Sequence, residues 1–248
     1  MKVKFLIFLF LSILFRINYV LGCTVVSAIS KDHQVWTMNN EDGPQGVANF
    51  INVFPQSENN KFGYFTLSYF SPEWGTGGSI QGGMNEKGLT FDFNTINPIE
   101  FDHTSRSAFP DGDDAILPYI LGNLSTVDKV IEFFNEYWFQ GGFTSAQMHV
   151  ADKNGTFAII SASGVLKVSE GEPLVSTNFD ICGKQDGSFC KRYPLAYSIL
   201  EENEANFQTM LKISAGTNQG GATLYTNIQN LSTGDIWFSS KHDPGHMV

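Results

Sequence analysis

The stretch CTVVSAISKDHQVWTMNNED, residues 23–42, holds the features that decide the fold. It opens with a cysteine and runs at once into apolar, β-branched residues, which is typical of a strand that enters a core. A polar turn over 30–33 separates this strand from a second one over 33–40. The stretch therefore predicts a β-hairpin with Cys23 at its beginning and polar side chains at its end.

The segment before Cys23 has the composition of a secretory signal peptide. It begins with Lys2 and Lys4, continues through the apolar run FLIFLFLSILF and closes on Val-Leu-Gly. The apolar run is shorter than the roughly 20 residues that span a membrane, so we expect export and no membrane span. Residues 1–22 are then a signal peptide and 23–248 a single domain, secreted or held in a secretory or lysosomal lumen, or in a bacterial periplasm.

The balance of charge argues against one class of partner. The chain has 15 Lys and Arg against 25 Asp and Glu, a formal net charge of −10 at pH 7. The expected leader holds Lys2, Lys4 and Arg16, so its removal makes the chain more acidic still. Such a surface repels phosphate backbones, and the sequence has no basic cluster to offset this. We expect no nucleic-acid partner.

The three cysteines need separate explanations in a chain expected to reach an oxidising compartment. Cys182 and Cys190 bracket the polar, turn-rich segment GKQDGSF, so a local disulfide is expected between them. Cys23 is then left over. An unpaired cysteine in a secreted protein is bonded to another chain, modified or reactive.

A lipid anchor is one alternative for Cys23, because Val-Leu-Gly-Cys resembles a bacterial lipoprotein cleavage site. An anchored cysteine is usually followed by a polar tether, whereas here an apolar strand begins directly after it. Asn-x-Ser/Thr sequons suit a eukaryotic secretory protein instead. The glycosylation candidates are Asn123, Asn154 and Asn230.

The rest of the chain predicts one continuous α+β domain. Strands are expected over 50–55, 63–70 and 88–96, in a meander over 146–179 and in a hairpin over 222–240. Helices are expected over 110–121, 125–139, 193–204 and 206–214, the second capped by Ser125. The glycine-rich run GTGGSIQGG, 75–83, lacks the Lys-Ser/Thr of a phosphate loop and is expected to form turns. This order favours layered sheets with helices outside them.

A cysteine at a new N-terminus can supply both a nucleophile and a base. Cleavage frees an α-amine with a pKa of about 8 next to a thiol with a pKa of about 8.5. The amine, directly or through a water, can take the thiol proton as sulfur attacks a carbonyl. Such a centre also needs a carboxylate to hold the amine and donors to meet the oxyanion.

Four segments, in order along the chain, resemble blocks of one known family. They are the Cys-Thr start with Asn40-Glu41-Asp42 at the end of the hairpin, GGMNEKGLTFDFNTI (82–96), the meander that ends in Thr-Asn (151–179), and YTNIQNLSTGDIWF (225–238). The set is similar to the linear amide hydrolases related to choloylglycine hydrolase and penicillin V acylase. The acyl-CoA:6-aminopenicillanate acyltransferases are broader relatives.

This resemblance implies a fold and a set of roles. The fold is a four-layer αββα sandwich, the N-terminal-nucleophile hydrolase architecture. Cys23 would be the nucleophile with its α-amine as the base, and Asp42 would pair with that amine. Asn178 would offer its side-chain amide to the oxyanion, and the segment around Asn94 a backbone N–H. No cofactor and no metal are expected.

The chain departs from that family in its arginines. Bile-salt and penicillin V hydrolases carry an Arg where this chain has Asn39, and another near the final hairpin. Outside the leader only Arg106 and Arg192 remain, and neither falls at those places. We therefore expect a site without those cations, which would otherwise lower the thiol pKa. Bile salts and penicillin V are not favoured as substrates.

The sequence thus predicts a secreted hydrolase that cleaves a linear, non-peptide amide of a small N-acyl compound through an acyl-thioester on Cys23. An acyltransferase that uses the same intermediate is the alternative within this class. A non-catalytic surface lipoprotein anchored through Cys23 is the alternative outside it. The sequence leaves the acyl group, the amine and the oligomeric state open.

Overall fold

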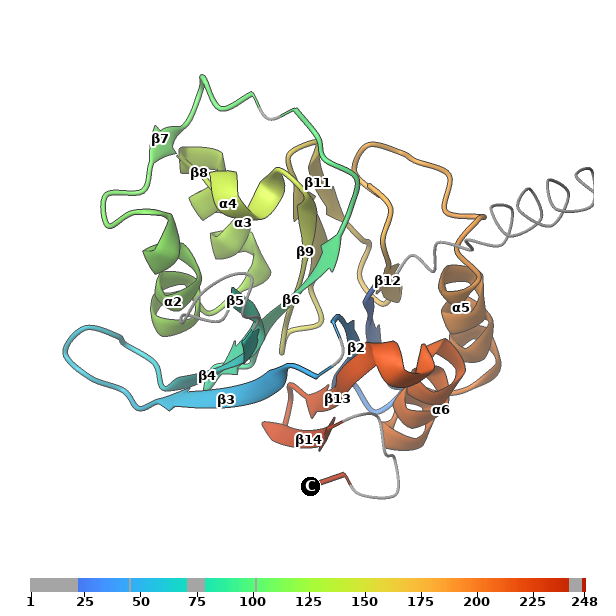
Figure 1. Ribbon diagram of the computed structural model, residues 1–248. Helices are drawn as coiled ribbons and strands as arrows, with labels where there is room; N and C mark the ends of the chain where they lie inside the picture. The colour runs from blue at the N-terminus through green and yellow to red at the C-terminus, as the bar shows by residue number, and fades with distance from the viewer. Residues whose placement is uncertain (1–21, 45, 71–78, 101, 241–246) are drawn as a thin grey trace, which may run out of the picture.

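The computed structural model describes residues 22–44, 46–70, 79–100, 102–240 and 247–248. Within these ranges the chain forms four layers in the order helices, sheet, sheet, helices (Figure 1). The predicted αββα sandwich is confirmed. The expected signal peptide lies outside the described residues, apart from Gly22. Across the same ranges, none of the helices combines the length and the apolar character needed to cross a membrane.

The first sheet is built around the hairpin that opens the domain. Its strand order is β12-β1-β2-β13-β14, and each pair is antiparallel. Thr24 on β1 lies opposite Asn40 on β2, so the residue that precedes β1 meets the end of β2. The strands are β1 (Thr24–Ile29), β2 (Val35–Asp42), β12 (Leu174–Ser176), β13 (Thr223–Asn230) and β14 (Asp235–Ser240).

The second sheet has seven strands in the order β11-β10-β9-β6-β5-β4-β3. They are β3 (Ala48–Phe54), β4 (Tyr64–Phe70), β5 (Ser79–Asn85), β6 (Leu89–Thr95), β9 (Ala146–Asp152), β10 (Phe157–Ser161) and β11 (Gly164–Lys167). Two short strands, β7 (Ser107–Ala108) and β8 (Tyr137–Trp138), pair with each other outside both sheets. The strands β3 and β14 therefore form edges of their respective sheets.

Helices cover the outer face of each sheet (Figure 1). The helices α2 (Asp113–Asn123), α3 (Val127–Glu136) and α4 (Gln140–Phe143) lie on the second sheet, and α5 (Arg192–Glu202) and α6 (Phe207–Thr217) on the first. The strands alternate, so Phe91 and Phe93 of β6 face the helices and pack with Phe133 and Phe134 of α3. Each sheet thus has its own apolar core against its own helices.

The layer between the two sheets changes character along its length. Away from Cys23 it is apolar, where Val35 and Leu231 of one sheet meet Met84 and Phe157 of the other. Toward Cys23 it is polar. The buried side chains in this polar layer include Ser27, Thr37, Asn39, Glu41, Thr90, Asp92, His149, Asn227 and Gln229.

Part of the glycine-rich run was wrongly expected to form turns. Residues 75–78 lie outside the described ranges, but Ser79–Asn85 form strand β5. Its glycines serve close packing. A Cβ on Gly82 would lie 2.7 Å from a carboxylate oxygen of Asp92, and one on Gly83 would lie 2.4 Å from the carbonyl oxygen of Phe65. Only glycine lets the neighbouring strand and side chain approach this closely.

The predicted cap of the second helix is displaced by one residue. Thr126, not Ser125, is the N-cap of α3, and its side chain accepts a hydrogen bond from the Lys129 backbone N–H. A threonine and a serine satisfy this role equally well, so the sequence alone could not separate the two positions.

The predicted disulfide is also wrong, because Cys182 and Cys190 are both free. The Cys182 thiol donates to the carbonyl oxygen of Ile159 at 3.5 Å, and Cys190 is buried next to the start of α5. The two thiols therefore lie in different surroundings. The loop between them contains hydrogen bonds of its own, among them those from the backbone N–H and the hydroxyl of Ser188 to the Asp186 carboxylate.

One glycosylation candidate is incompatible with this fold. Asn230 is only 5 % exposed, and its side-chain oxygen accepts hydrogen bonds from the backbone of Ser232 and Thr233. A glycan cannot be attached there without displacing the β13–β14 turn. Asn154 lies exposed in the β9–β10 turn and Asn123 is half-buried at the end of α2, and both stay predictions.

Candidate active site

Cys23 lies directly before β1, where the hairpin brings it to the end of β2. Its side chain is 4 % exposed, and its Sγ lies 3.9 Å from the backbone oxygen of Asp42. This proximity follows from the register of β1 and β2, in which Thr24 faces Asn40. The hairpin predicted for the stretch 23–42 is present, and its register places Cys23 beside Asp42.

Asn178 reaches the same place from the segment that follows β12. Strand β12 pairs with β1, with Ser176 opposite Val25, which carries Asn178 to the level of Cys23. Its Nδ2 donates to the carbonyl oxygen of Thr95 at 2.8 Å, at the end of β6. The three residues that the resemblance singled out from distant parts of the chain, Cys23, Asp42 and Asn178, are therefore neighbours.

Arg192 is a site residue that the sequence prediction missed. Its Nη1 donates to the backbone oxygens of Gly22 and Cys23, the latter at 2.8 Å, and to Oγ1 of Thr24 at 2.8 Å. Its Nη2 donates to Oδ1 of Asn178 at 2.9 Å. The two arginines of the resembling enzymes are missing from their places, as expected, but the first turn of α5 brings a guanidinium to the backbone of Cys23 from a different part of the fold.

Gln219 is a second residue that the sequence did not reveal. It follows α6, and its Nε2 donates both to the carbonyl oxygen of Gly22, at 2.8 Å, and to the carboxylate of Asp42. Thr223 donates to the other carboxylate oxygen of Asp42. Burial raises the pKa of Asp42, while the bonds from Thr223 and Gln219 and the charge of Arg192 act in the opposite direction. The carboxyl is thus held in a fixed orientation.

The carbonyl of Gly22 occupies the centre of this arrangement. Arg192 and Gln219 both donate to its oxygen, so a carbonyl adjacent to Cys23 is bound by two side-chain donors. No larger residue fits in place of Gly22, because a Cβ there would lie 1.9 Å from Oδ1 of Asn178. The last residue of the expected leader is therefore in contact with three of the side chains of the site.

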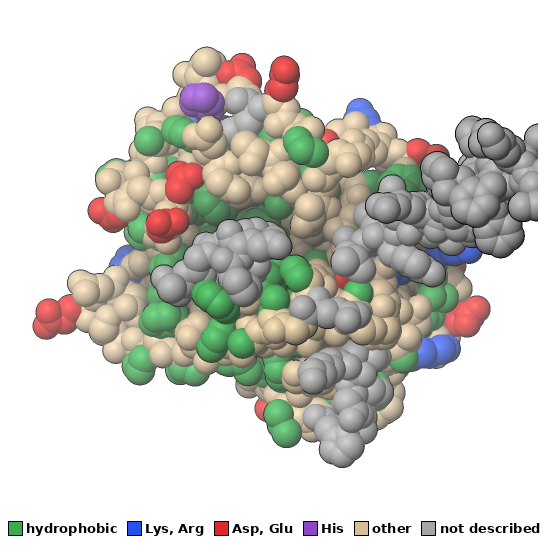
Figure 2. Space-filling model, viewed as in Figure 1, with side chains coloured by type: hydrophobic (Ala, Val, Ile, Leu, Met, Phe, Trp, Pro, Cys, Tyr) green, Lys and Arg blue, Asp and Glu red, His purple; other side chains and the backbone are tan. Residues whose placement is uncertain are grey.

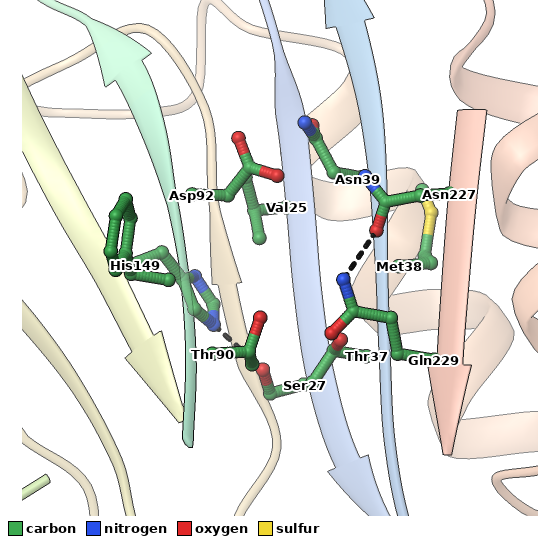
Figure 3. Close-up of a pocket in the computed structure, with 11 residues that line it drawn as sticks. Val25, Ser27, Thr37, Met38, Asn39, Thr90, Asp92, His149, Asn227 and Gln229 are labelled. Atoms are coloured by element: carbon green, nitrogen blue, oxygen red, sulfur yellow. Dashed lines mark hydrogen bonds between the residues drawn. The ribbon is translucent and has the colours of Figure 1, made fainter. Parts of the chain in front are cut away.

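A pair of buried acidic side chains lies behind Cys23. Glu41 is 2 % exposed and Asp92 is 5 % exposed. Asn39 donates to Glu41 from Nδ2 at 3.2 Å. Figure 3 shows the carboxyl of Asp92 and the amide of Asn39 facing one another between β6 and β2. The Asn39 side-chain amide thus interacts with both buried carboxyls.

The burial of these groups changes their protonation. Burial, followed by the nearby Asp92 charge, raises the pKa of Glu41, and burial raises the pKa of Asp92 to about 8. The pKa of Cys23 is raised by burial and by the charges of Glu41 and Asp42. While its nitrogen still belongs to the peptide bond with Gly22, Cys23 is therefore a neutral thiol at neutral pH.

Asn94 is not joined to Cys23 by any hydrogen bond among the described residues. It lies on the inner face of β6, fully buried, and neither polar atom of its side chain has a partner there. Its neighbour Thr95 supplies the carbonyl that binds Asn178. Nor do the described ranges hold three or more His, Cys, Asp or Glu side chains grouped to bind a metal ion.

The layer order and the strand order are those of the N-terminal-nucleophile hydrolase fold. Solved structures share it over most of this chain. Penicillin V acylase from Agrobacterium tumefaciens has a TM-score of 0.59 at 15% identity. The match covers 90% of this chain and 84% of the acylase chain. A mutant of the conjugated bile acid hydrolase from Clostridium perfringens has a TM-score of 0.61 at 13% identity, with 91% of each chain covered.

A third similar structure is the Caenorhabditis elegans N-acylethanolamine-hydrolyzing acid amidase ortholog, with a TM-score of 0.56 at 16% identity over 85% of this chain and 93% of its own. At these identities the likeness establishes the fold. The sequence itself matches no family model and no curated protein.

Proposed function

We propose that this protein is a cysteine amidohydrolase that cleaves the linear amide bond of a small N-acyl compound after residues 1–22 have been removed. The observation that carries the proposal is the carbonyl next to Cys23, bound by Arg192 and Gln219 beside the amide of Asn178. In this position the Gly22 carbonyl stands in for the acyl carbonyl of a substrate. The three similar structures are described as an acylase, a hydrolase and an amidase, which supports the same reaction class.

Removal of the leader completes the catalytic group. Cleavage of the Gly22–Cys23 bond frees the α-amine of Cys23 beside the oriented carboxylate of Asp42. The amine then takes the proton of the Cys23 thiol, as in other N-terminal nucleophiles. Departure of Gly22 also releases one acceptor of Gln219 and one of Arg192, so both donors become available to an incoming carbonyl.

The reaction follows in two balanced steps. The Cys23 sulfur attacks the acyl carbon and the C–N bond breaks, while the α-ammonium returns its proton to the departing amine. A water then attacks the thioester, the C–S bond breaks, and a carboxylic acid and the free thiol result. Asn178 has a second Nδ2 proton, beyond the one given to Thr95, with which to stabilise the oxyanion in both steps.

The burial of Cys23 argues against the lipid-anchor alternative. A diacylglyceryl group on Sγ needs the sulfur at the surface, whereas the side chain is 4 % exposed and enclosed by the ends of β1 and β2. The proposal therefore places the protein in a secretory or lysosomal lumen, outside the cell or in a periplasm, with a free N-terminal cysteine. The mass of the mature N-terminus tests this directly, because an anchored chain carries the lipid on Cys23.

The activity itself is tested with purified protein that begins at Cys23. A panel of N-acyl amides that vary in acyl chain and amine is incubated with it, and intact-mass spectrometry follows the protein. We expect turnover of part of the panel and an acyl adduct on the peptide that contains Cys23. Transfer of the acyl group to an added amine, without release of acid, would assign the acyltransferase reaction instead. Turnover with no dependence on Cys23 would overturn the proposal.

A further inference from the structure

A large apolar cavity lies between the edge regions of the two sheets, away from the residues that contact Cys23. Its volume is about 650 Å³, within the range of about 300–1,000 Å³ that is typical of small-molecule sites. Strands β3 and β4 form one wall and β14 the other. The apolar lining includes Ile51, Val53, Phe65, Leu67, Ile236 and Phe238.

The walls of this cavity are unusually exposed for apolar side chains. Val53 is 72 % exposed, Ile51 is 51 % exposed and Ile236 is 37 % exposed. Figure 2 shows hydrophobic side chains at the surface over β3 and β4. Contiguous exposed apolar surface in a protein of this kind marks a place where an apolar ligand or partner binds.

Two lysines lie at one end of the cavity. Lys87 is in the turn between β5 and β6, and Lys153 is in the turn between β9 and β10. Gly88, the residue after Lys87, passes close to Lys153: it has a φ of +74°, and a Cβ on it would lie 2.9 Å from Cβ of Lys153. The cavity therefore joins a long apolar wall to a pair of cations, in a chain where acidic residues outnumber basic ones.

The charges at this end are only partly balanced by the protein. Lys87 lies 3.3 Å from the carboxylate of Glu86 and 5.2 Å from the centre of the Phe62 ring. Among the described residues, Lys153 is in no ion pair with a carboxylate. Lys153 is thus the cation left without a carboxylate among the described residues at this end, since Lys87 has Glu86 and the nearby Asp235 carboxylate accepts a hydrogen bond from Thr233.

The cavity and the Cys23 site are separate. Leu67 of the cavity wall packs with Tyr69 and Tyr225, and burial, followed by the charge of Glu41 and then that of Cys23, raises the pKa of both tyrosines. These two rings therefore stand between the cavity and the reaction centre. A ligand in the cavity would contact neither Cys23 nor Asn178.

We propose that this cavity is a binding site for an amphipathic carboxylate, with its apolar chain between β3, β4 and β14 and its carboxylate at Lys87 and Lys153. The chemistry that recognises such a ligand is a long apolar wall that ends in two cations. A neutral lipid would leave the lysines unused, and a cationic amphiphile would be repelled by them. The site does not depend on the proposed reaction at Cys23.

The test uses the secreted protein and dodecanoate as the probe, followed by titration calorimetry. We expect saturable one-to-one binding with a negative heat-capacity change, weakened about fourfold for each methylene removed from the chain. Dodecanol should bind more weakly, and dodecyltrimethylammonium more weakly still. The variant Cys23→Ala should bind dodecanoate as the parent does, which separates this site from the reaction centre.

Two pairs of variants locate the site. Lys87→Ala/Lys153→Ala should weaken dodecanoate binding by about two- to thirtyfold but leave dodecanol binding unchanged. The control, Lys129→Ala/Lys212→Ala, removes two exposed lysines on the outer helices and should have no effect. Val53→Glu places a carboxylate in the wall and should abolish binding, whereas Val165→Glu, on the opposite edge of the same sheet, should not.

Three results would overturn the proposal. The first is no saturable binding of dodecanoate by a folded protein. The second is equal binding of dodecanoate and dodecanol that the double lysine variant does not change. The third is a dimer in light scattering that Val53→Glu dissociates, together with no binding of dodecanoate. The cavity would then be an interface between two copies of the chain.

Discussion

Arg192 holds Asn178 in one orientation through the 2.9 Å bond from its Nη2 to the side-chain oxygen. With Oδ1 occupied in this way, the Nδ2 group of Asn178 is directed to the opposite side, where it meets the carbonyl of Thr95. The guanidinium simultaneously binds the backbone of residues 22 and 23. A single cation thus positions both the nucleophile and the expected oxyanion donor.

Replacement of Arg192 should therefore lower the rate of catalysis about as much as replacement of Asn178 itself. We expect Arg192→Ala to lower kcat by roughly 10²–10³, the usual effect of losing an oxyanion donor, and Arg192→Lys to recover little because a lysine cannot bind both partners. Steady-state kinetics on the best substrate of the amide panel measures this. The adjacent Lys191→Ala is the matched control, and an equal loss there would contradict the assignment.

Loss of the sulfur should abolish turnover while the fold survives. Cys23→Ala removes the nucleophile but leaves a side chain small enough for the buried position, so circular dichroism and the melting temperature should stay close to those of the parent. Product formation measured by mass spectrometry should fall to background. A folded Cys23→Ala protein that forms product at the rate of the parent would contradict the proposed mechanism.

Asn178 and Cys23 should act as one unit. Asn178→Ala alone is expected to lower kcat by roughly 10²–10³. The double variant Cys23→Ala/Asn178→Ala should be scarcely worse than Cys23→Ala, since the oxyanion forms only after sulfur attacks. Kinetics of the two single variants and the double variant checks this. Losses that multiply would show that Asn178 contributes to a different step.

The contact between Gly22 and Asn178 predicts an effect on maturation. A valine at position 22 cannot coexist with the Asn178 side chain, because even a Cβ would lie 1.9 Å from its oxygen. We expect Gly22→Val to displace Asn178 and to slow removal of the leader, measured as the fraction of uncleaved chain by intact mass. Asn178→Ala in the same chain should relieve the clash. If the double variant matures no better than Gly22→Val, the cause lies in recognition of the leader itself.

The buried carboxyls predict that stability falls as pH rises. The folded-state pKa of Asp92, about 8, is above its ordinary value of about 4, so its contribution is fully present below the latter and is lost as pH rises through the former. We expect the melting temperature to fall over that window. In Asp92→Asn, which stays neutral, the fall should be smaller, and the exposed Asp235→Asn should behave like the parent. Identical pH profiles for all three proteins would contradict the burial of a neutral Asp92.

The sequence predicted the elements whose signals are local. The hairpin of β1 and β2, the closing hairpin of β13 and β14 and the outer helices follow from alternation, periodicity and turn residues close together in the chain. Position along the family pattern also placed Cys23, Asp42 and Asn178 in one site. Strand β5 was missed because Gly82 and Gly83 look like turn residues, and only the neighbouring Asp92 and Phe65 explain why they lie in a sheet.

The residues missed at the site have no local signal. Arg192 is 169 residues from Cys23 in the sequence, and Gln219 is 177 residues from Asp42, so their contacts depend on how α5 and α6 dock on the sheet. The burial of Glu41 and Asp92 likewise depends on how the second sheet packs over the first. The prediction that Cys182 pairs with Cys190 was wrong for a related reason, because proximity in the sequence does not determine where each thiol points.

The polar layer between the sheets divides this protein into two halves. Each half is one sheet with its helices and its own apolar core, and near Cys23 the two halves meet along a seam of polar side chains. The oxygens of Asn39 and Gln229 lack a partner among the described side chains, and the void beside them, about 10 Å³, has the size that one water needs. The halves are held together there by hydrogen bonds rather than by apolar contact, among them those of His149 on β9 with Ser27 on β1 and Ser176 on β12. Separation of the sheets at this seam would expose little hydrophobic surface but would break buried hydrogen bonds, so the joint between the halves should be more sensitive to the loss of one polar partner than to the loss of apolar volume.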